Sequence, residues 1–387
     1  MDFELSNEQK MARETAREFA RKRLAPVALK LDEEEAIPRE LYAEAAELGF
    51  FGILLPEEHG GLGLDHVAYA LIMEEIARAC AAFEICLSVH NSLVCDAIRR
   101  FGTDEQKRRW LPRLAKGDWI GAYSLSEQGS GSDAGSLRCA ARKDGDGYRL
   151  DGSKAWVSSA GFADLFLVFV LTEPELKSRG VSCLVVEKGR PGITIGKKEK
   201  KLGVRASDTR ELHFADARVP AGNLLGKENE GFKIALTQLD NGRVGIAAQA
   251  VGIAQAAFDE AVAYARQRRQ FGKSLAEFQS TQFKLADMSM KVDAARLLVW
   301  RAASLLSAGR RATREASAAK LFASETANAV AYQALQLHGG NGYIREFPVE
   351  RYFRDARITE IYEGTSEIQR LVIAREVLKA AEEGRAS

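Results

Sequence analysis

The sequence predicts an α+β protein of several domains: a helical N-terminal domain, a middle antiparallel β-domain and a C-terminal bundle of helices. Residues up to about Asp118 are rich in Ala, Glu and Arg, with apolar residues at helical spacing. From there to Lys227, short β-branched and aromatic runs are separated by Gly and Pro, and from about Glu228 long helical patterns return. A chain of 387 residues is long enough for three cores. We therefore expect domains at residues 1–118, 119–227 and 228–387.

Local signals place the helices of the first domain. Ser6 and Gln9 fit a capping box, and the helix that they open is predicted to end near Pro26. Pro38 fits the first turn of the next helix. The glycines of Glu58–Gly63 interrupt the helical pattern and predict a loop.

The middle region carries the signals of short strands joined by turns. The Asp-Gly-Asp-Gly run at Asp144–Gly147 is typical of a tight turn between two strands. We expect further strands at Leu165–Leu171, Val181–Val186 and Glu211–Phe214. Together these runs predict a small antiparallel β-domain.

The last region is dominated by two long helical patterns. Phe283, Met290 and Leu297 recur every seven residues along one apolar stripe, with Leu305 one step later. A second, Ala-rich helix is predicted from about Glu315 until the glycine pair that begins at Gly339. Long antiparallel helices of this kind pack as a bundle.

Composition excludes several classes of function. Lys plus Arg number 55 and Asp plus Glu number 54, so the formal charge of +1 argues against a nucleic-acid or anionic-membrane partner. The five cysteines are scattered without C-x-x-C spacing, which is typical of free thiols in a reducing compartment, and the five dispersed histidines predict no zinc or other metal site. The acidic start lacks the apolar segment of a secretory signal. The longest apolar run, Leu165–Leu171, is far shorter than the roughly 20 residues of a membrane helix. We expect a soluble, cytoplasmic protein.

Leu125–Gly135 is the first stretch that could carry chemistry. Gly129, Gly131 and Ala134 match the G-x-G-x-x-A form of a dinucleotide fingerprint. The following residues, Leu137–Arg142, have the pattern of a strand, whereas the fingerprint requires a helix there. The stretch is either a flexible surface loop or a nest of backbone N–H groups that binds a phosphate or a flavin edge.

Three further stretches each have a plain and a functional interpretation. Trp156–Ser158 follows a predicted strand, so the tryptophan either packs in the core or lies beside a flat ring such as flavin. Ile361–Glu367 places a carboxylate directly before a glycine, which is most often a helix cap. Asp240–Arg243 is equally consistent with a solvated helix start.

These four stretches occur in an order that resembles the acyl-CoA dehydrogenase family, most closely its short-chain and short branched-chain members. The likeness extends from about Glu8 to about Leu378 and includes Leu202–Ser207, Arg268–Gly272 and Leu337–Tyr343. The resemblance implies FAD between the β-domain and a C-terminal four-helix bundle, with the acyl chain between helices. It also implies acyl-CoA as substrate, electrons passed to an electron-transferring flavoprotein, and a homotetramer built as a dimer of dimers. The associated pathways are fatty-acid or branched-chain amino-acid catabolism.

The resemblance also assigns roles to individual residues. Glu363 matches the catalytic base; some relatives carry the base at the position of Gly242, where glycine cannot serve. Arg268 and Gln279 match residues that reach the FAD of a neighbouring subunit. Substrate contacts fall on Ser132, Asp240, Arg243 and Gly364. FAD contacts fall on Tyr123, Leu125, Ser126, Gly131, Ser132, Trp156, Val157, Ser158, Arg268, Phe271, Gln279, Gln336, Leu337, Gly339, Gly340, Thr365, Ser366 and Glu367.

Two departures from the family pattern lie in the proposed flavin-contacting segments. Gln128 stands where proline is usual, which predicts a less rigid loop, and Ser158 replaces threonine but keeps the hydroxyl.

The resemblance implies that the Glu363 N–H and a ribityl hydroxyl bind the thioester oxygen while trans-2-enoyl-CoA forms. Burial of Glu363 beside an acyl chain should raise its pKa and make it a better base. Gly242 and Ser88–Leu93 favour short acyl groups. Oxygen-using oxidases and a nucleic-acid-associated relative share the fold and remain alternatives.

Overall fold

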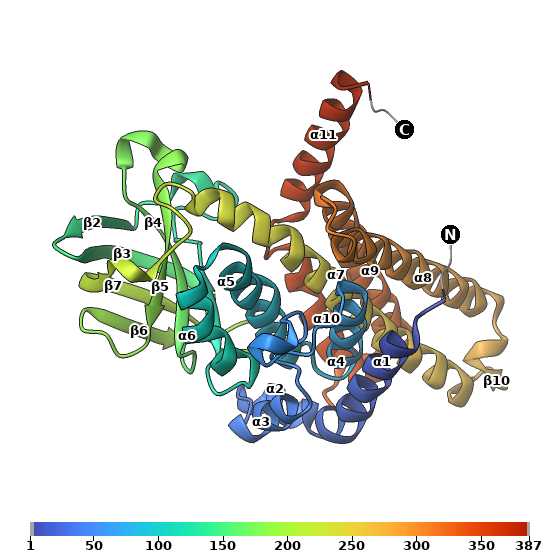
Figure 1. The fold of residues 1–387 in the computed structure, drawn as a ribbon. Coiled ribbons are helices and arrows are strands. Elements are labelled where there is room, and N and C mark those ends of the chain that lie inside the picture. The colour runs from blue at the N-terminus through green and yellow to red at the C-terminus, as the bar shows by residue number, and fades with distance from the viewer. Residues whose placement is uncertain (1–3, 385–387) are drawn as a thin grey trace.

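The chain folds into helices, then a β-sheet, then helices again, as expected from the sequence. The computed structural model describes residues 4–384. Figure 1 shows the sheet at one side of the molecule, the long helices at the other, and α11 projecting from the body. Helices fill the chain up to Ala115, strands lie between Gly121 and Leu225, and helices resume at Gly231. The α+β fold class is therefore confirmed.

The N-terminal helices begin where the sequence signals place them. Ser6 caps α1 (Asn7–Phe19), and the capping box with Gln9 is present. The chain then continues through a wider π-helical turn, Ala20–Leu24, and a tighter 3-10 turn, Ala25–Val27, that contains Pro26. Pro38 precedes α3 as its N-cap. The remaining helices are α2 (Ala28–Glu34), α3 (Arg39–Glu47), α4 (His66–Ser88), α5 (Asp96–Phe101) and α6 (Asp104–Ala115).

The sheet is mixed, which corrects the purely antiparallel expectation. Most neighbours are antiparallel, and the turn before Gly147 joins β2 to β3 as predicted. However, β1 pairs with β4 in parallel, and Ala140 of β2 pairs in parallel with Leu171 of β4. The β2–β3 hairpin separates β1 from β4 in sequence, and this long connection lets the chain re-enter the sheet in the same direction. The path is β6-β7-β3-β2-β4-β5-β8, with bounds β1 (Gly121–Ser124), β2 (Ala140–Asp144), β3 (Gly147–Ser158), β4 (Leu165–Leu171), β5 (Val181–Glu187), β6 (Ile193–Lys198), β7 (Thr209–Pro220) and β8 (Leu224–Leu225).

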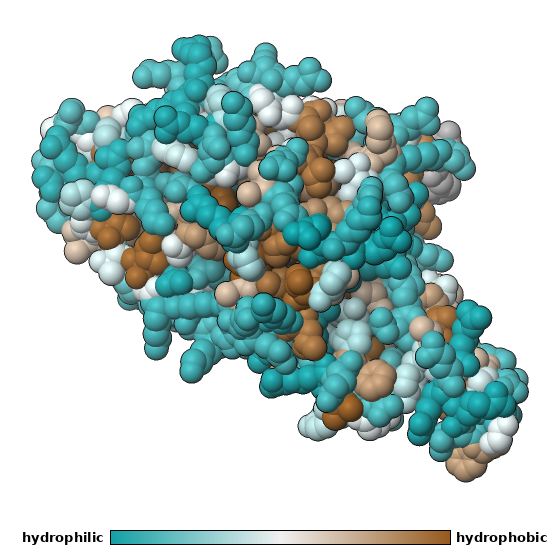
Figure 2. All heavy atoms as spheres, turned by 90° about the horizontal axis from the view of Figure 1, so that it is seen from below, coloured by the Kyte–Doolittle hydropathy of each residue, from teal (hydrophilic) through white to brown (hydrophobic). Residues whose placement is uncertain are grey.

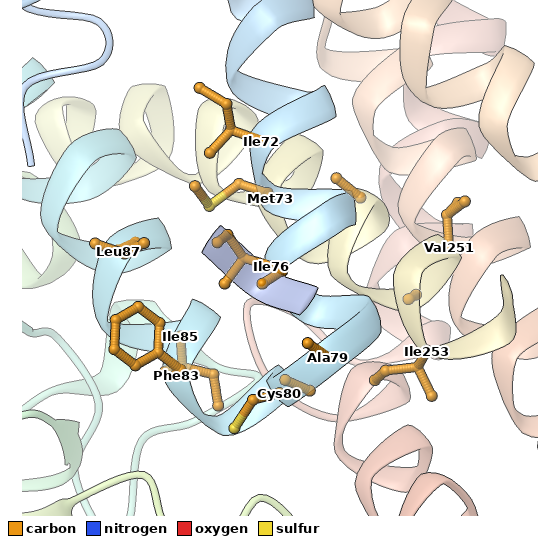
Figure 3. Packing of buried hydrophobic residues seen from close by; sticks show 14 of the residues in the cluster. Ile72, Met73, Ile76, Ala79, Cys80, Phe83, Ile85, Leu87, Val251 and Ile253 are labelled. Atoms are coloured by element: carbon orange, nitrogen blue, oxygen red, sulfur yellow. The ribbon is translucent and has the colours of Figure 1, made fainter. Parts of the chain in front are cut away.

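Two glycines let α7 pack closely against α4 in the centre of the molecule. A Cβ added at Gly245 would overlap the hydroxyl of Ser88, and one at Gly252 would overlap the Glu74 carbonyl. Apolar side chains of both helices fill the rest of this contact (Figure 3). The C-terminal elements are α7 (Gly231–Gln267), the hairpin β9 (Arg269–Gln270) and β10 (Lys273–Ser274), α8 (Gln279–Ser307), α9 (Thr313–His338), α10 (Val349–Ala356) and α11 (Ser366–Glu382).

The apolar stripe of α8 faces away from the core of this chain. Phe283, Met290 and Leu297 are 61%, 63% and 45% exposed, whereas Met288 and Val292 on the other side are buried. The seven-residue spacing identifies an apolar face, but it does not say what covers that face. Among residues 4–384, no helix is long and apolar enough to cross a membrane.

One ion cluster joins all three regions of the chain. The carboxylate of Asp32 on α2 accepts hydrogen bonds from Arg205 of the middle domain and from Arg354 of α10, each at 2.7 Å. Arg205 belongs to the stretch Leu202–Ser207 that carries part of the family resemblance. These contacts fix the sheet against both sets of helices.

Candidate active site

Glu363 lies in the turn between α10 and α11, with its carboxylate directed at α7. Its φ is 51°, and Gly364 follows at 95°. The interpretation of Glu363 as a helix cap is wrong, because the side chain of Thr365 caps α11. A Cβ added at Gly242 of α7 would overlap Oε2 of Glu363. That oxygen is buried and has no hydrogen-bond partner among residues 4–384.

Burial and two neighbouring cations set the pKa of Glu363. Burial raises the pKa of the carboxyl from 4.5 to about 7, although the positive charges of Lys320 and Arg243 oppose the rise. Lys320 is itself fully buried, and burial lowers its pKa to about 8. Its ammonium donates to the Gly364 carbonyl at 2.7 Å. Gln369 donates to the carbonyls of Glu363 and Gly364 at 3.1 and 2.9 Å, so the turn is held from two sides.

Asp240–Arg243 lies well inside α7 and is not a solvated helix start, which corrects that interpretation. Arg243 is buried, and its guanidinium donates to Asp240 at 2.7 Å. Asp240 also accepts from the Thr313 hydroxyl at 2.6 Å. This pair places a fixed positive charge close enough to Glu363 to act on its pKa.

A chain of polar side chains links the residue before Glu363 to α7 and α4. The Tyr362 hydroxyl donates to Oε1 of Gln249, and Nε2 of Gln249 donates to Glu84 at 2.5 Å. Burial, followed by the charge of Glu363, raises the pKa of Glu84 well above its usual range. The other oxygen of Glu84 is buried and has no partner among the described residues.

No motif in the sequence marks Lys320, Gln369, Gln249 or Glu84. The available signal is a polar residue inside a run of small or apolar residues: Lys320 lies on the same helical face as Ala316 and Ala323. A solvated position gives the same pattern, so only the packing reveals these side chains as buried.

Two of the proposed flavin-contacting segments lie side by side in the sheet domain. The Ala155 N–H donates to the Ser126 carbonyl at 2.9 Å, next to a shift of register in β3. Trp156 has a φ of 59° and is 56% exposed, so the interpretation as a core tryptophan is wrong. Gln128, the departure from proline, donates to Glu211 at 2.6 Å. These segments and the adjoining β1 contain the other predicted flavin contacts of the sheet domain: Tyr123, Leu125, Ser126, Gly131, Ser132, Val157 and Ser158.

A second group of predicted contacts lies far from Glu363 in the same chain. Arg268 follows α7, 26 residues after Gly242, which corresponds to about 39 Å along a helix. The end of α9 lies beside it, because His338 stacks on Tyr264 with ring centroids 4.1 Å apart. Figure 1 shows the adjoining hairpin at the end of the bundle opposite the sheet. The exposed members of this group are Arg268, Phe271, Gln279, Gln336, Gly339 and Gly340, with Leu337 partly buried.

The Glu363 carboxyl has a raised pKa, which is common for functional groups in active sites, and Trp156 of the sheet offers an exposed flat ring to a cofactor. Models of the acyl-CoA dehydrogenase N-terminal, middle and C-terminal domains match residues 6–118, 122–217 and 229–378. The chain belongs to the acyl-CoA dehydrogenase family. It is therefore an FAD-dependent oxidoreductase with acyl-CoA dehydrogenase activity.

Individual relatives are similar over almost the full length. The mitochondrial short-chain specific acyl-CoA dehydrogenase of Bos taurus is 51% identical over 377 residues, covering 97% of this chain and 92% of the relative. Butyryl-CoA dehydrogenase from Megasphaera elsdenii matches with a TM-score of 0.96 and 44% identity, over 98% of this chain and 100% of that chain. A chain from a structure of the electron transferring flavoprotein of Acidaminococcus fermentans matches with a TM-score of 0.97 and 45% identity, with the same coverage.

The residues present fit FAD. The hydroxyls of Ser124 and Ser366 are buried without hydrogen-bond partners among residues 4–384, as is one oxygen of Glu363. Trp156 offers an exposed ring, and a Cβ added at Gly131 would meet nothing within 4 Å, so the loop beside it has room for a ligand. No group of three or more metal-ligating side chains is found in the described part of the chain.

Proposed function

We propose that this protein oxidises short acyl-CoA thioesters of roughly four to six carbons, straight or singly branched, to trans-2-enoyl-CoA. Glu363 takes the α-proton. The observation that carries the proposal is the Glu363 carboxyl, which is buried against Gly242, keeps one oxygen unpartnered, and has a pKa raised to about 7. A carboxylate with a raised pKa is a stronger base than a solvated one.

The chain supplies the acid–base chemistry and the positioning. Oε2 of Glu363 accepts the proton, and the Glu363 N–H, which donates to no other backbone group in residues 4–384, binds the thioester oxygen. Lys320 and Gln369 hold the turn so that both groups of Glu363 keep their places. Bound FAD would supply the acceptor for the hydride that leaves the β-carbon of the substrate. Asp240 and Arg243 bind the CoA portion, with Ser132 and Gly364 as further substrate contacts.

The closed end of the pocket supports a short acyl group. Gln249 follows Gly242 by seven residues on α7, which is about 10 Å along the helix. In this proposal the polar chain of Gln249, Glu84 and Tyr362 bounds the acyl site at that distance along α7 from Gly242. Leu93, from the stretch that resembles short-chain relatives, packs beside Gly242.

We propose further that FAD is shared between two chains of a homotetramer arranged as a dimer of dimers. The distance of about 39 Å along α7 supports this, because an extended FAD molecule is shorter. One chain then provides Tyr123–Ser132, Trp156–Ser158 and Thr365–Glu367. The neighbouring chain provides Arg268, Phe271, Gln279, Gln336, Leu337, Gly339 and Gly340.

An electron-transferring flavoprotein is the proposed electron acceptor. Support comes from the similar chain found in a structure of the electron transferring flavoprotein of Acidaminococcus fermentans. Catabolism of fatty acids or branched-chain amino acids is the corresponding pathway. All five cysteines are buried free thiols, which supports a location in the reducing cytoplasm.

A substrate panel tests this proposal. Purified holoenzyme is mixed anaerobically with straight and branched acyl-CoAs of increasing length, and bleaching of the flavin is followed. The highest specificity constants are expected at four to six carbons, and a maximum at twelve or more would contradict the proposal.

Steady-state turnover with an electron-transferring flavoprotein, compared with oxygen consumption at an electrode, tests the acceptor. Rapid oxygen consumption without the flavoprotein would identify an oxidase instead.

A further inference from the structure

Lys154 is a fully buried lysine in the sheet domain. Its side chain is 0% exposed, although lysine is almost never buried without a partner. From β3 its ammonium donates to Oε1 of Glu127 at 2.7 Å and to the Leu125 carbonyl at 3.0 Å. Burial lowers the pKa of Lys154, and the negative charge of Glu127 opposes part of this effect.

The carboxylate of Glu127 also accepts hydrogen bonds from backbone N–H groups and so closes a loop. Its two oxygens accept from the backbone N–H groups of Arg138 at 2.7 Å and Cys139 at 3.0 Å. The carboxylate thus ties residue 127 to the far end of the loop that contains Gly131 and Ser132. The ion pair therefore bonds to backbone groups on both sides of the loop, at Leu125 before it and at Arg138 and Cys139 after it.

The same pair lies where two segments meet. Lys154 stands two residues before Trp156, and Ala155 between them donates to the Ser126 carbonyl at 2.9 Å. The register of β3 against β7 shifts between Lys154 and Val157, and Trp156 takes a positive φ there. A buried ion pair contributes little net stability compared with apolar residues of similar size, so its use here points to specific geometry.

We infer that Lys154 and Glu127 are positioning residues that hold the loop Leu125–Ser132 against Trp156–Ser158, so that both segments meet one flavin. The inference rests on the proposed FAD contacts of these two segments. Neither residue takes part in the proposed chemistry. The pair acts through the backbone that it fixes.

The test compares Lys154→Met with wild type and with Arg142→Met. Arg142 is an exposed residue of the same sheet, paired with Asp216 away from the loop, so it serves as a matched control. FAD is removed and titrated back, and both the dissociation constant and the visible absorption of the bound flavin are recorded. Lys154→Met is expected to weaken FAD binding roughly tenfold or more and to alter the spectrum, while Arg142→Met changes neither.

Thermal unfolding separates positioning from simple stabilisation of the domain. FAD stabilises the folded protein by an amount that depends on its affinity, so Lys154→Met should narrow the gap in Tm between holoprotein and apoprotein. The inference would be overturned if Lys154→Met lowered the Tm of holoprotein and apoprotein by the same amount. It would also be overturned if the FAD affinity of the variant lay within twofold of wild type. If Lys154→Met does not fold, Lys154→Gln, which can still donate to Leu125, gives the same comparison with the same two outcomes. A wild-type protein that binds no FAD would instead refute the proposed function.

Discussion

Glu363 combines several features that are unfavourable for folding. Its φ of 51° is rare for a residue with a side chain, one oxygen is buried without a partner, and burial penalises its charged form. Each such feature costs on the order of 1–3 kcal/mol and persists only where the surroundings enforce it. Lys320 and Gln369 are those surroundings, because both are buried and both hold the turn. This concentration of strain and desolvation is typical of a functional residue.

Glu363→Gln should retain FAD and bind acyl-CoA, yet lose flavin reduction. The amide has nearly the same size but cannot take the α-proton, and loss of a general base lowers rates by about 10²–10⁴-fold. Anaerobic stopped-flow bleaching by butyryl-CoA measures the effect. Reduction at a near wild-type rate would mean that another residue abstracts the proton.

Activity and stability should depend on pH in opposite directions through the same carboxyl. The base must be ionised, so kcat/KM should rise with pH and level off above about 7. The folded pKa is above the unfolded value of 4.5, so the native state binds more protons in this window. Stability should therefore fall as pH rises from 4.5 to 7, by at most about 3 kcal/mol.

The free energy of unfolding of wild type and Glu363→Gln, measured with denaturant at pH 5 and pH 8, tests this dependence of stability on pH. The glutamine variant should be more stable than wild type at pH 8, with a smaller difference at pH 5. A difference that does not change with pH would show that the native carboxyl has an ordinary pKa.

At the scale of single elements, α7 has the largest part in the site. One helix carries Gly242 against Glu363, Arg243 bonded to Asp240, and Gln249 bonded to Glu84. Because α7 is one continuous helix of 37 residues, its rise per residue sets the spacing between these groups. Gly242 and Gly245 have no side chains, so Glu363 can approach the helix backbone at the first position and Ser88 at the second. The small residues of α7 thus decide how closely Glu363 and Ser88 approach this helix.

Gln249→Ala should move the preferred substrate toward longer acyl chains. The substitution shortens the side chain that closes the pocket and leaves Glu84 and Tyr362 without their shared partner. Loss of these hydrogen bonds should also cost about 1–3 kcal/mol of stability. Specificity constants across the acyl-CoA series measure the shift, with the exposed Gln267→Ala on the same helix as control. An unchanged optimum would place the floor of the pocket elsewhere.

Elements whose signals are local were predictable from the sequence. Leu165–Leu171 is a continuous apolar run, and it forms β4 with the same bounds; the Ala-rich helix ends at His338, directly before the predicted glycines. The burial of Lys320 and the exposure of Phe283 were not predictable, because both depend on which distant segments pack there. The site residues came from family resemblance, since a lone glutamate before a glycine has no distinctive spacing. Their roles, and the domain boundaries near residues 118 and 227, stay predictions.

For the whole molecule, the exposed apolar surface is a feature that supports the proposed assembly of several chains. The stripe of Phe283, Met290 and Leu297 on α8 is uncovered, and Leu371 and Leu378 are 60% and 65% exposed on α11. Figure 2 shows apolar patches at the surface on the face seen from below. Large exposed apolar areas mark contact sites between proteins, and closed symmetric assemblies are the usual result.

Arg268→Ala should weaken both FAD retention and the oligomer. If FAD bridges two chains, its binding free energy adds to that of assembly, so loss of one contact affects both. Flavin content after gel filtration and mass by sedimentation measure the two effects. Arg266→Ala, an exposed arginine two residues earlier, is the control. A fully active, FAD-saturated monomer of the wild type would refute the shared site.

The separation of Gly242 and Arg268 along α7 also has a consequence for genetics. Two loss-of-function alleles, one encoding Glu363→Gln and the other Arg268→Ala, should complement each other when both chains are made in one cell. A mixed pair of chains has one site with both defects and one site with neither. Random pairing leaves about one quarter of all sites intact, since half of the pairs are mixed. If each site belonged to a single chain, the two alleles would together restore nothing.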